Sequence, residues 1–474
     1  MKRYELDEDA TIEAIMIEFI NTFYEGEANP GKGPVCTIAP DDVLERLKNQ
    51  EMPKQGRDVE SVVSELMTDI YPYSLRSSHP RHFGFIPGPA TKLSVLGDLM
   101  SSAYNVHASN WVNSSAASTV EENTIQWLTK QIGYDNQAGG LFVSGGSMAN
   151  LTGLIAARDK ILTEENRHLG VIYLSDQTHH SVEKGLKIIG FTSRQFRFIE
   201  TDDLFQIKSD VLEKTILNDL DQGLVPCCVV ATAGTTNTGT VDPLDEIGDL
   251  CNKYNLWMHV DGAYGASFLL STNQVHRLHG IHKADSVSWD AHKLLFQTYS
   301  CAMILVKDKQ DLLNSFDASP EYLKDIDGDR VTNFGSLGIE LTRPTRALKL
   351  WLSLQTIGIE EYTRRIDYGQ TLANYVQERI IKSNHWEMIS PAQFSIINFR
   401  YVHPSLSDLE TDALNTYLAK QIVADEFAGI FTTELKGHTV LRMCTINPIT
   451  TIEDLEGTIN HLETLATHYL NTNH

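Results

Sequence analysis

Between about residues 135 and 310, short and continuous apolar runs alternate with longer stretches in which apolar residues recur at helical spacing. The apolar runs are GLFVSG, VIYLSD, CCVVATAG, LWMHVDGA, SVSWDAH and CAMILVK. Stretches such as MANLTGLIAARDKIL and PLDEIGDLCNKY separate several of them. Continuous apolar strands separated by helices are typical of a mostly parallel sheet with helices on both faces. The pattern therefore predicts an α/β domain in this part of the chain.

The two flanking regions have different patterns. Residues 1–75 are helical and amphipathic in pattern, with a Gly- and Pro-rich loop at residues 25–34 and no obvious core of their own. From about residue 346 a helix, two strands and a final helix predict a smaller C-terminal α/β domain. We therefore expect three parts, at residues 1–75, 76–345 and 346–474.

Composition and charge narrow the class of protein. The chain has 474 residues, of which 42% are hydrophobic and 21% charged, as in globular proteins. Its net charge of −23 argues against nucleic acid and anionic membranes as partners, because both attract Lys and Arg. The six cysteines form no C-x-x-C pair, and we find neither a signal peptide nor an apolar run of membrane-spanning length. We expect a cytoplasmic protein that binds neither nucleic acid nor membrane.

Polar residues follow the predicted strands at the point where each strand ends. In parallel sheets ligands bind outside the carboxyl ends of the strands, so these residues are the first candidates for a site. They are Ser147, His179, Thr235, Asp261 and Lys293.

Three of these positions together indicate one cofactor. The Gly-rich turn SGGSMAN at residues 144–150 leads into a helix whose first amides can bind an anion. Asp261 can pair with a protonated ring nitrogen, and a desolvated Lys293 can act as a nucleophilic amine. Each feature alone has a plainer interpretation: a turn without ligand, a structural carboxylate, a solvated lysine. Pyridoxal 5'-phosphate (PLP) has a phosphate, a pyridine nitrogen and an aldehyde, which is why the combination indicates PLP.

Ring contacts complete this hypothesis. Ala263 is small enough for a flat ring to lie against it, and His179 can stack on a pyridine face. We predict no metal site, because no Asp, Glu or Cys stands at ligand spacing beside the two histidines of SDQTHHSVEKG.

The chain resembles the group II PLP-dependent amino-acid decarboxylases, and bacterial tryptophan decarboxylases in particular. The resemblance extends from about residue 55 to 465 and includes HPRHFGFIPGP, SGGSMAN, ATAGTTNTGTVDPL, HVDGAYGAS, DSVSWDAHKLL and PEYLKD. It implies PLP fold type I, which is aspartate aminotransferase-like, with a mostly parallel seven-stranded sheet in the large domain and a smaller C-terminal domain. It also implies a homodimer with its active site at the subunit interface, in which residues 1–75 wrap the partner.

The resemblance assigns roles to individual residues. Lys293 binds the PLP aldehyde covalently, and Asp261 pairs with the pyridinium nitrogen. His179 stacks on one face of the ring and Ala263 lies on the other. Thr235 is placed near the ring substituents. The remaining assignment is a phosphate site made by Gly146, Ser147 and His292.

The same resemblance implies a substrate site built partly across the dimer. Tyr322, in a loop at about 317–335, acts from the partner subunit, and Phe85 and His107 line the pocket. At Asn113 and Gly335 the chain differs from the tryptophan enzymes, in which we expect an apolar residue and a Trp. We therefore expect Asn113 and Gly335 to govern substrate choice.

The resemblance implies α-decarboxylation of an L-amino acid to the amine and CO2, and we expect an aromatic, tryptophan-like substrate. An acidic or small polar substrate, as in glutamate and cysteine-sulfinate decarboxylases, is the alternative. An oxygen-dependent aromatic aldehyde synthase is a second alternative, against which Tyr322 and His179 argue. A non-enzymatic scaffold is disfavoured because Lys293, Asp261 and Ser147 are all present. One further departure is Asp290-Ala291, where those relatives that have an N-P-H-K motif carry Asn-Pro; the bacterial tryptophan decarboxylases share the WDAHK form.

Overall fold

A computed structural model of the chain describes residues 9–26, 31, 33–86, 88–317 and 331–473. Residues cluster into two compact units. The larger unit comprises Phe85–Val402 and Arg442–Pro448, and the smaller comprises Met1–Gly84, His403–Leu441 and Ile449–His474. The three-part division at residues 75 and 345 stays a prediction.

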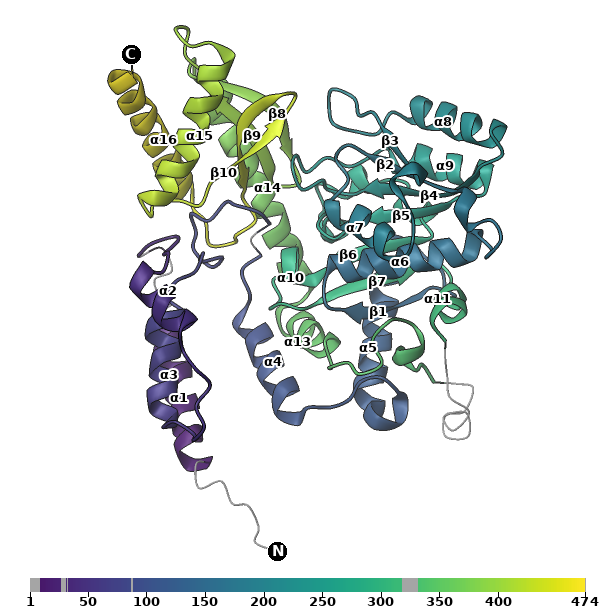
Figure 1. Cartoon of the computed structure of the whole chain (residues 1–474), viewed down its shortest axis with the longest axis horizontal. Helices are drawn as coiled ribbons and strands as arrows, with labels where there is room; N and C mark the ends of the chain where they lie inside the picture. The colour runs from purple at the N-terminus through teal and green to yellow at the C-terminus, as the bar shows by residue number, and fades with distance from the viewer. Residues whose placement is uncertain (1–8, 27–30, 32, 87, 318–330, 474) are drawn as a thin grey trace, which may run out of the picture. The chain divides into compact units, whose positions relative to one another are not determined.

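The larger unit is built on a seven-stranded sheet in the order β1-β7-β6-β5-β4-β2-β3 (Figure 1). The strands are β1 (Gly139–Val143), β2 (Gly170–Ser175), β3 (Phe196–Ile199), β4 (Val225–Thr232), β5 (Trp257–Asp261), β6 (Ser286–Asp290) and β7 (Ala302–Val306). The β2–β3, β2–β4, β4–β5 and β5–β6 pairs are parallel, whereas β7 is antiparallel to β1 and β6. The predicted mostly parallel sheet is therefore confirmed, and the carboxyl ends of its parallel strands meet at one edge.

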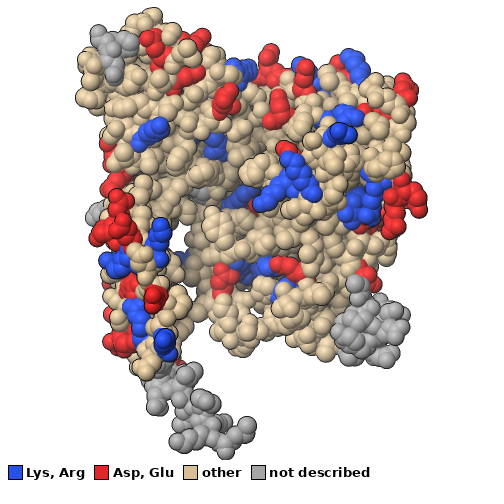
Figure 2. Space-filling view, viewed as in Figure 1, with Lys and Arg blue, Asp and Glu red and all other residues tan. Residues whose placement is uncertain are grey.

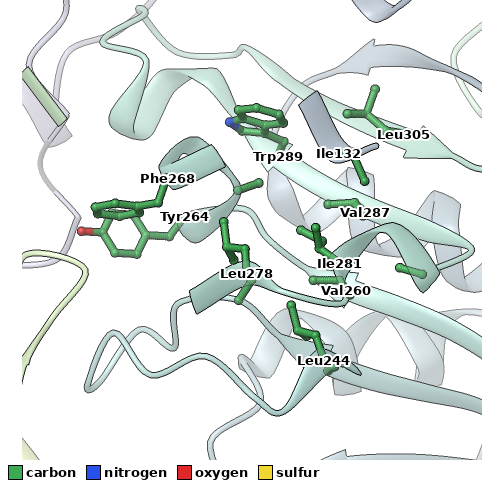
Figure 3. Packing of buried hydrophobic residues seen from close by; sticks show 14 of the residues in the cluster. Ile132, Leu244, Val260, Tyr264, Phe268, Leu278, Ile281, Val287, Trp289 and Leu305 are labelled. Carbon is green, nitrogen blue, oxygen red and sulfur yellow. The ribbon is translucent and has the colours of Figure 1, made fainter. Parts of the chain in front are cut away.

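Helices cover both faces of this sheet, which explains why most residues of its strands are apolar and buried. One face packs against α5 (Trp111–Ile132), α8 (Ser209–Asp221) and α9 (Leu244–Tyr254), and the other against α6 (Gly146–Ile161), α7 (His180–Ile188) and α11 (Lys309–Phe316). Along β4, Val229 and Ala231 belong to the first core, whereas Cys228 and Val230 belong to the second. Figure 3 shows part of the first core, which includes Val260 and Val287 of neighbouring strands and Leu244 of α9.

The other elements include a second, four-stranded sheet of order β10-β11-β9-β8 in the C-terminal region, as expected. The larger unit also contains α4 (Lys92–Tyr104), α10 (Ala291–Leu294), α13 (Ala347–Ile357), α14 (Ile359–Ile381), β8 (Trp386–Gln393) and β9 (Ile396–Tyr401). Its short helical turns are η2 (Arg167–Leu169), η3 (Ser193–Gln195), η4 (Gly265–Leu270), η5 (Val275–Leu278), η6 (Ile281–Lys283) and η7 (Phe334–Ser336). The smaller unit contains α1 (Asp9–Gly26), α2 (Asp41–Lys48), α3 (Val59–Glu65), η1 (Leu66–Ile70), α15 (Asp408–Ala424), β10 (Phe431–Leu435) and α16 (Ile452–Asn473), and β11 (His438–Cys444) begins in it.

In the smaller unit, the segment before residue 84 contacts C-terminal residues. The Phe83 amide donates to the Gly429 carbonyl at 2.9 Å, and the Arg81 Nε donates to the Phe427 carbonyl at 2.8 Å. Among the described residues, no helix is both long and apolar enough to cross a membrane. Acidic and basic side chains both occur across the face seen in Figure 2.

Candidate active site

A cavity of about 490 Å³ lies at the carboxyl ends of the parallel strands in the larger unit. The lining brings together most of the residues that the sequence singled out, from segments far apart in the chain. These are Gly146, Ser147, His179, Asp261, Ala263, His292 and Lys293. The short segments that follow β1, β2, β5 and β6 carry them, as the strand-end argument predicts.

One end of the cavity is suited to an anion. The chain leaves β1, turns at Ser144 and Gly145, and enters α6 at Gly146. The first amides of a helix have no carbonyl partner within it, so those of Gly146 and Ser147 can bind a ligand anion. A Cβ on Gly146 would lie 2.9 Å from the Asp290 carboxylate and 3.0 Å from the Ala263 Cβ. The turn can therefore approach these residues only because Gly146 has no side chain.

Asp261, the last residue of β5, is 6% exposed and its carboxylate is held by three donors. Asn150 Nδ2 donates to Oδ2 at 2.9 Å. The Ser288 hydroxyl and the Ala263 amide both donate to Oδ1, each at 3.2 Å. A buried carboxylate with this many partners has one fixed orientation.

The buried network extends from Asp261 to His259. Its Nε2 donates to Asn150 Oδ1 at 3.1 Å, while its Nδ1 lies 2.7 Å from the Ser286 hydroxyl. Burial lowers the pKa of His259 to about 4, so the ring is neutral and orients Asn150 as a donor toward Asp261.

His179 precedes α7 and lies at the cavity wall. Its Nδ1 is 2.7 Å from the Ser181 hydroxyl, which fixes the ring at the helix N-terminus. Burial lowers the pKa of His179, and this effect exceeds the opposing attraction of the Asp261 carboxylate. The ring is therefore neutral at pH 7 and suited to lie against a flat, electron-poor ligand.

Lys293 lies in α10, directly after β6, and its side chain is 26% exposed. Its Nζ is 3.1 Å from Asp290 Oδ2. Burial opposes the ammonium charge, but the Asp290 and Asp261 carboxylates outweigh that effect, and the pKa of Lys293 is raised. Neighbouring His292 donates from Nδ1 to the Cys301 carbonyl at 2.9 Å, and burial lowers its pKa.

The other predicted residues that the structure describes, Thr235 and four substrate-site residues, do not line this cavity. The Thr235 hydroxyl is buried and lies 2.7 Å from that of Thr238, whereas the next residue, Thr236, lines the cavity. Tyr322 lies outside the described residues.

The four predicted substrate-site residues lie elsewhere in the larger unit. Phe85 is 63% exposed, and its carbonyl accepts from Arg442 at 2.7 Å. Asn113 Nδ2 is 3.3 Å from His107 Nδ1, so these two predicted residues contact each other. The Gly335 amide donates to the Ser109 carbonyl at 2.8 Å, and a Cβ on Gly335 would lie 2.6 Å from the Ser109 Oγ. Their role in a pocket shared between subunits stays a prediction.

Sequence reasoning missed Asn150, His259 and the contact of Asp290 with Lys293. For His259 the signal was present, because residues two apart in a strand share one face and His259 is two residues before Asp261. Asn150 is four residues after Gly146, one helical turn along the same face of α6.

Comparison with known proteins agrees with this geometry. The pyridoxal-dependent decarboxylase conserved domain matches residues 40–402. The chain belongs to the pyridoxal-dependent decarboxylase family. An aromatic-L-amino-acid decarboxylase of Bacillus atrophaeus is 40% identical over 438 residues, which cover 91% of each chain. A phenylacetaldehyde synthase of Petunia hybrida is 29% identical over 477 residues, 96% of this chain and 94% of the relative. A crystal structure of Oryza sativa TDC with PLP and tryptamine superposes with a TM-score of 0.92 at 25% identity, covering 99% of both chains.

The cavity fits the cofactor of this decarboxylase family. It offers helix amides and His292 for a phosphate, a fixed carboxylate for a pyridinium nitrogen, and Lys293 for an aldehyde. Ala263 and the neutral His179 ring supply apolar surface on which a flat ring can lie. The donor set therefore matches the three reactive parts of PLP, and the enzyme is a PLP-dependent decarboxylase by family.

Gly88 is expected to be essential for the position of Lys293. A Cβ at Gly88 would lie 1.8 Å from the Lys293 carbonyl oxygen, which is backbone and cannot rotate away. We expect Gly88→Ala to displace the α10 backbone and to weaken PLP binding at least tenfold, measured by titrating PLP against the enzyme's fluorescence. The matched control is Gly185→Ala in α7, where the nearest atom is 3.7 Å away, and an added methyl should leave PLP affinity unchanged. Equal PLP affinity in Gly88→Ala and wild type would contradict the packing described.

Proposed function

We propose that this decarboxylase removes the α-carboxylate of an aromatic L-amino acid as CO2 and releases the amine. The observation that carries the proposal is the convergence of the α6 N-terminus, Asp261 and Lys293 on one cavity. The substrate class is supported by the 40% identity to the aromatic-L-amino-acid decarboxylase of Bacillus atrophaeus.

Each residue of the chain has a defined task in this proposal. Lys293 would hold the cofactor covalently through its amine, which the substrate amine would replace during the reaction. Asp261, fixed by Asn150, holds a proton on the ring nitrogen. PLP, when bound, accepts the electron pair of the breaking bond between Cα and the carboxylate. His179 excludes water from one face of the ring, which favours loss of the carboxylate charge.

Tyr322 is expected to decide the product by delivering a proton to the substrate Cα. This role is implied by resemblance and is not tested by the described residues. An aldehyde synthase is the second candidate, because the Petunia hybrida relative carries that name. The proposal favours the amine because Tyr322 is present in this sequence.

A substrate panel tests both the substrate class and the product. The enzyme, saturated with PLP, would be given L-tryptophan, L-tyrosine, L-glutamate or L-2,4-diaminobutyrate in separate reactions under air. CO2, amine and peroxide would be measured in each reaction. We expect the highest kcat/KM for an aromatic substrate, amine equal to CO2, and no peroxide. Higher kcat/KM for glutamate or diaminobutyrate would overturn the substrate class, and peroxide equal to CO2 would overturn the product.

We also propose that the enzyme is a homodimer. Two helices expose apolar side chains that a second copy would cover, as the resemblance implies. In α1 these are Met16, Ile17, Phe19, Ile20 and Phe23, and in α4 they are Val95, Leu96, Leu99, Met100 and Tyr104. We expect sedimentation equilibrium to give twice the chain mass of 53.1 kDa at nanomolar concentration. A monomer with full activity would contradict this expectation.

We also propose a cytoplasmic location without nucleic-acid or membrane partners. All six cysteines lie in the described ranges as free thiols, five of them buried, which agrees with a reducing compartment. The net charge of −23 disfavours polyanionic partners.

A further inference from the structure

Among the described acidic residues, Asp290 alone forms an ion pair with the Lys293 amine, and the assigned roles do not use it. It ends β6 and is 2% exposed. Its Oδ2 lies 3.1 Å from Lys293 Nζ and 3.5 Å from His292 Nε2. Its Oδ1 is buried and has no hydrogen-bond partner among the described residues.

The position of Asp290 is unusual because the anion end of the cavity lies beside it. The carboxylate lines the cavity and would lie within 2.9 Å of a Cβ on Gly146, the first residue of α6. A buried carboxylate is costly unless a cation compensates its charge. Of its two basic neighbours, Lys293 is the nearer, and burial disfavours the charged form of His292. The charge of Asp290 is therefore balanced mainly by the Lys293 ammonium.

We propose that Asp290 is a positioning residue that holds Lys293 as an ammonium in the cofactor-free cavity and thereby makes cofactor capture pH-dependent. The inference rests on the proposed function, in which Lys293 condenses with an aldehyde. An ammonium has no lone pair, so one proton must leave first. The nitrogen of the neutral amine then forms a bond to the aldehyde carbon, and the carbonyl oxygen leaves as water with the two remaining amine hydrogens.

Four other titratable groups face Lys293, and two of them favour its ammonium form. Asp261, from β5, and the Tyr299 hydroxyl, from the segment after α10, favour the ammonium. His179, which precedes α7, and His292, beside Lys293 in α10, are neutral rings and add no positive charge at pH 7. Among these described groups, only Asp290 forms a direct ion pair with Nζ, so replacing it should have the largest effect.

The test measures the pKa of the Lys293 amine without using activity. Full-length enzyme freed of cofactor would be trace-labelled with acetic anhydride across a pH series, and the extent of labelling of the Lys293 peptide determined by mass spectrometry. Asp290→Asn keeps the shape and removes the charge, as in relatives with Asn at this position. We expect its Lys293 labelling curve to lie about one to three pH units below that of wild type. In Asp290→Glu, which keeps the charge, the Lys293 labelling curve should return at least half of the way to that of wild type.

Internal and matched controls separate this effect from a general change in folding. Lys160, which pairs with Asp311 at 2.7 Å, is labelled in the same digest and should not shift in Asp290→Asn. Asp311→Asn should shift Lys160 and leave Lys293 unchanged. Asp290→Ser serves as a second variant if Asp290→Asn does not fold. Unchanged Lys293 labelling in the folded charge-free variant would overturn the inference.

The second measurement is the rate of PLP capture, trapped by borohydride at short times across the same pH series. In Asp290→Asn the pH at half-maximal rate should fall with the labelling curve, and an unshifted capture profile would overturn the pH-dependence. If the proposed function is wrong, no PLP will be trapped on Lys293 in the wild-type enzyme at any pH. The labelling experiment would still report the effect of Asp290 on the pKa of the Lys293 amine.

Discussion

Replacing Lys293 with alanine should abolish CO2 release by enzyme supplied with saturating PLP and L-tryptophan. Lys293 lies in the same cavity as Asp261 and the α6 N-terminus, and its amine is the group suited to condense with an aldehyde there. A positioned acid or base alone contributes about 10²–10⁴-fold to a rate. Because Lys293 is also proposed to bind the cofactor covalently, the fall should be at least this large, and the rate of CO2 release measures it.

Lys293→Arg is the control that tests whether a positive charge at this position is sufficient or whether an amine that can lose a proton is required. An arginine keeps a cation beside Asp290 but does not lose its proton near neutral pH. The fold should therefore be retained, with the same loss of CO2 release as in Lys293→Ala. CO2 release within tenfold of wild type in either variant would contradict the role assigned to Lys293.

Replacing Arg343 with methionine should lower the free energy of unfolding by about 3–5 kcal/mol. The Arg343 and Glu121 side chains are 0% and 2% exposed and lie 2.6 Å apart. Arg343 also donates to the Ala108 carbonyl at 2.9 Å and the Phe142 carbonyl at 2.8 Å, so it joins the segment before α5 to β1. Without Arg343 the Glu121 charge would remain buried with no cation beside it. Urea unfolding monitored by circular dichroism measures the change.

Two controls test whether burial of the ion pair causes the expected loss of stability. The exposed pair of Arg364 and Glu361 has the same 2.6 Å separation, but the Arg364 side chain is 76% exposed. Arg364→Met should change the free energy of unfolding by less than about 1 kcal/mol. The double variant Glu121→Leu with Arg343→Met removes both charges and should recover at least half of the loss. Equal losses in Arg343→Met and Arg364→Met would contradict this account.

The sheet could be predicted because its signal is local. Each strand is a short apolar run bounded by turn residues, and the helices between the runs imply parallel neighbours. The same logic located Asp261 and Lys293, since a residue that follows a parallel strand lies at the ligand-binding edge. The two compact units of the chain could not be predicted from such local patterns. Residues 403–441 cluster with residues 1–84, and no local pattern links segments so far apart in sequence.

The pairing of buried polar residues that are distant in sequence was beyond the sequence for the same reason. Asn150 reaches Asp261 across 111 positions of the chain, and Arg343 reaches Glu121 across 222. Such pairs depend on which helix covers which strand, and that is decided by packing. The turn after β4 directs the Thr235 hydroxyl to Thr238 and brings Thr236 to the cavity wall, and strand-end position does not distinguish these two neighbours. The role of Thr235 near the ring substituents stays a prediction.

The central claim is that this cavity binds PLP through Lys293, and borohydride reduction of the wild-type enzyme with PLP tests it most directly. Reduction fixes the cofactor to the amine that holds it, and peptide mass spectrometry identifies that amine. We predict one PLP per chain, on the peptide that contains Lys293. PLP on a different lysine, or no PLP fixed to the protein at saturating cofactor, would contradict the account.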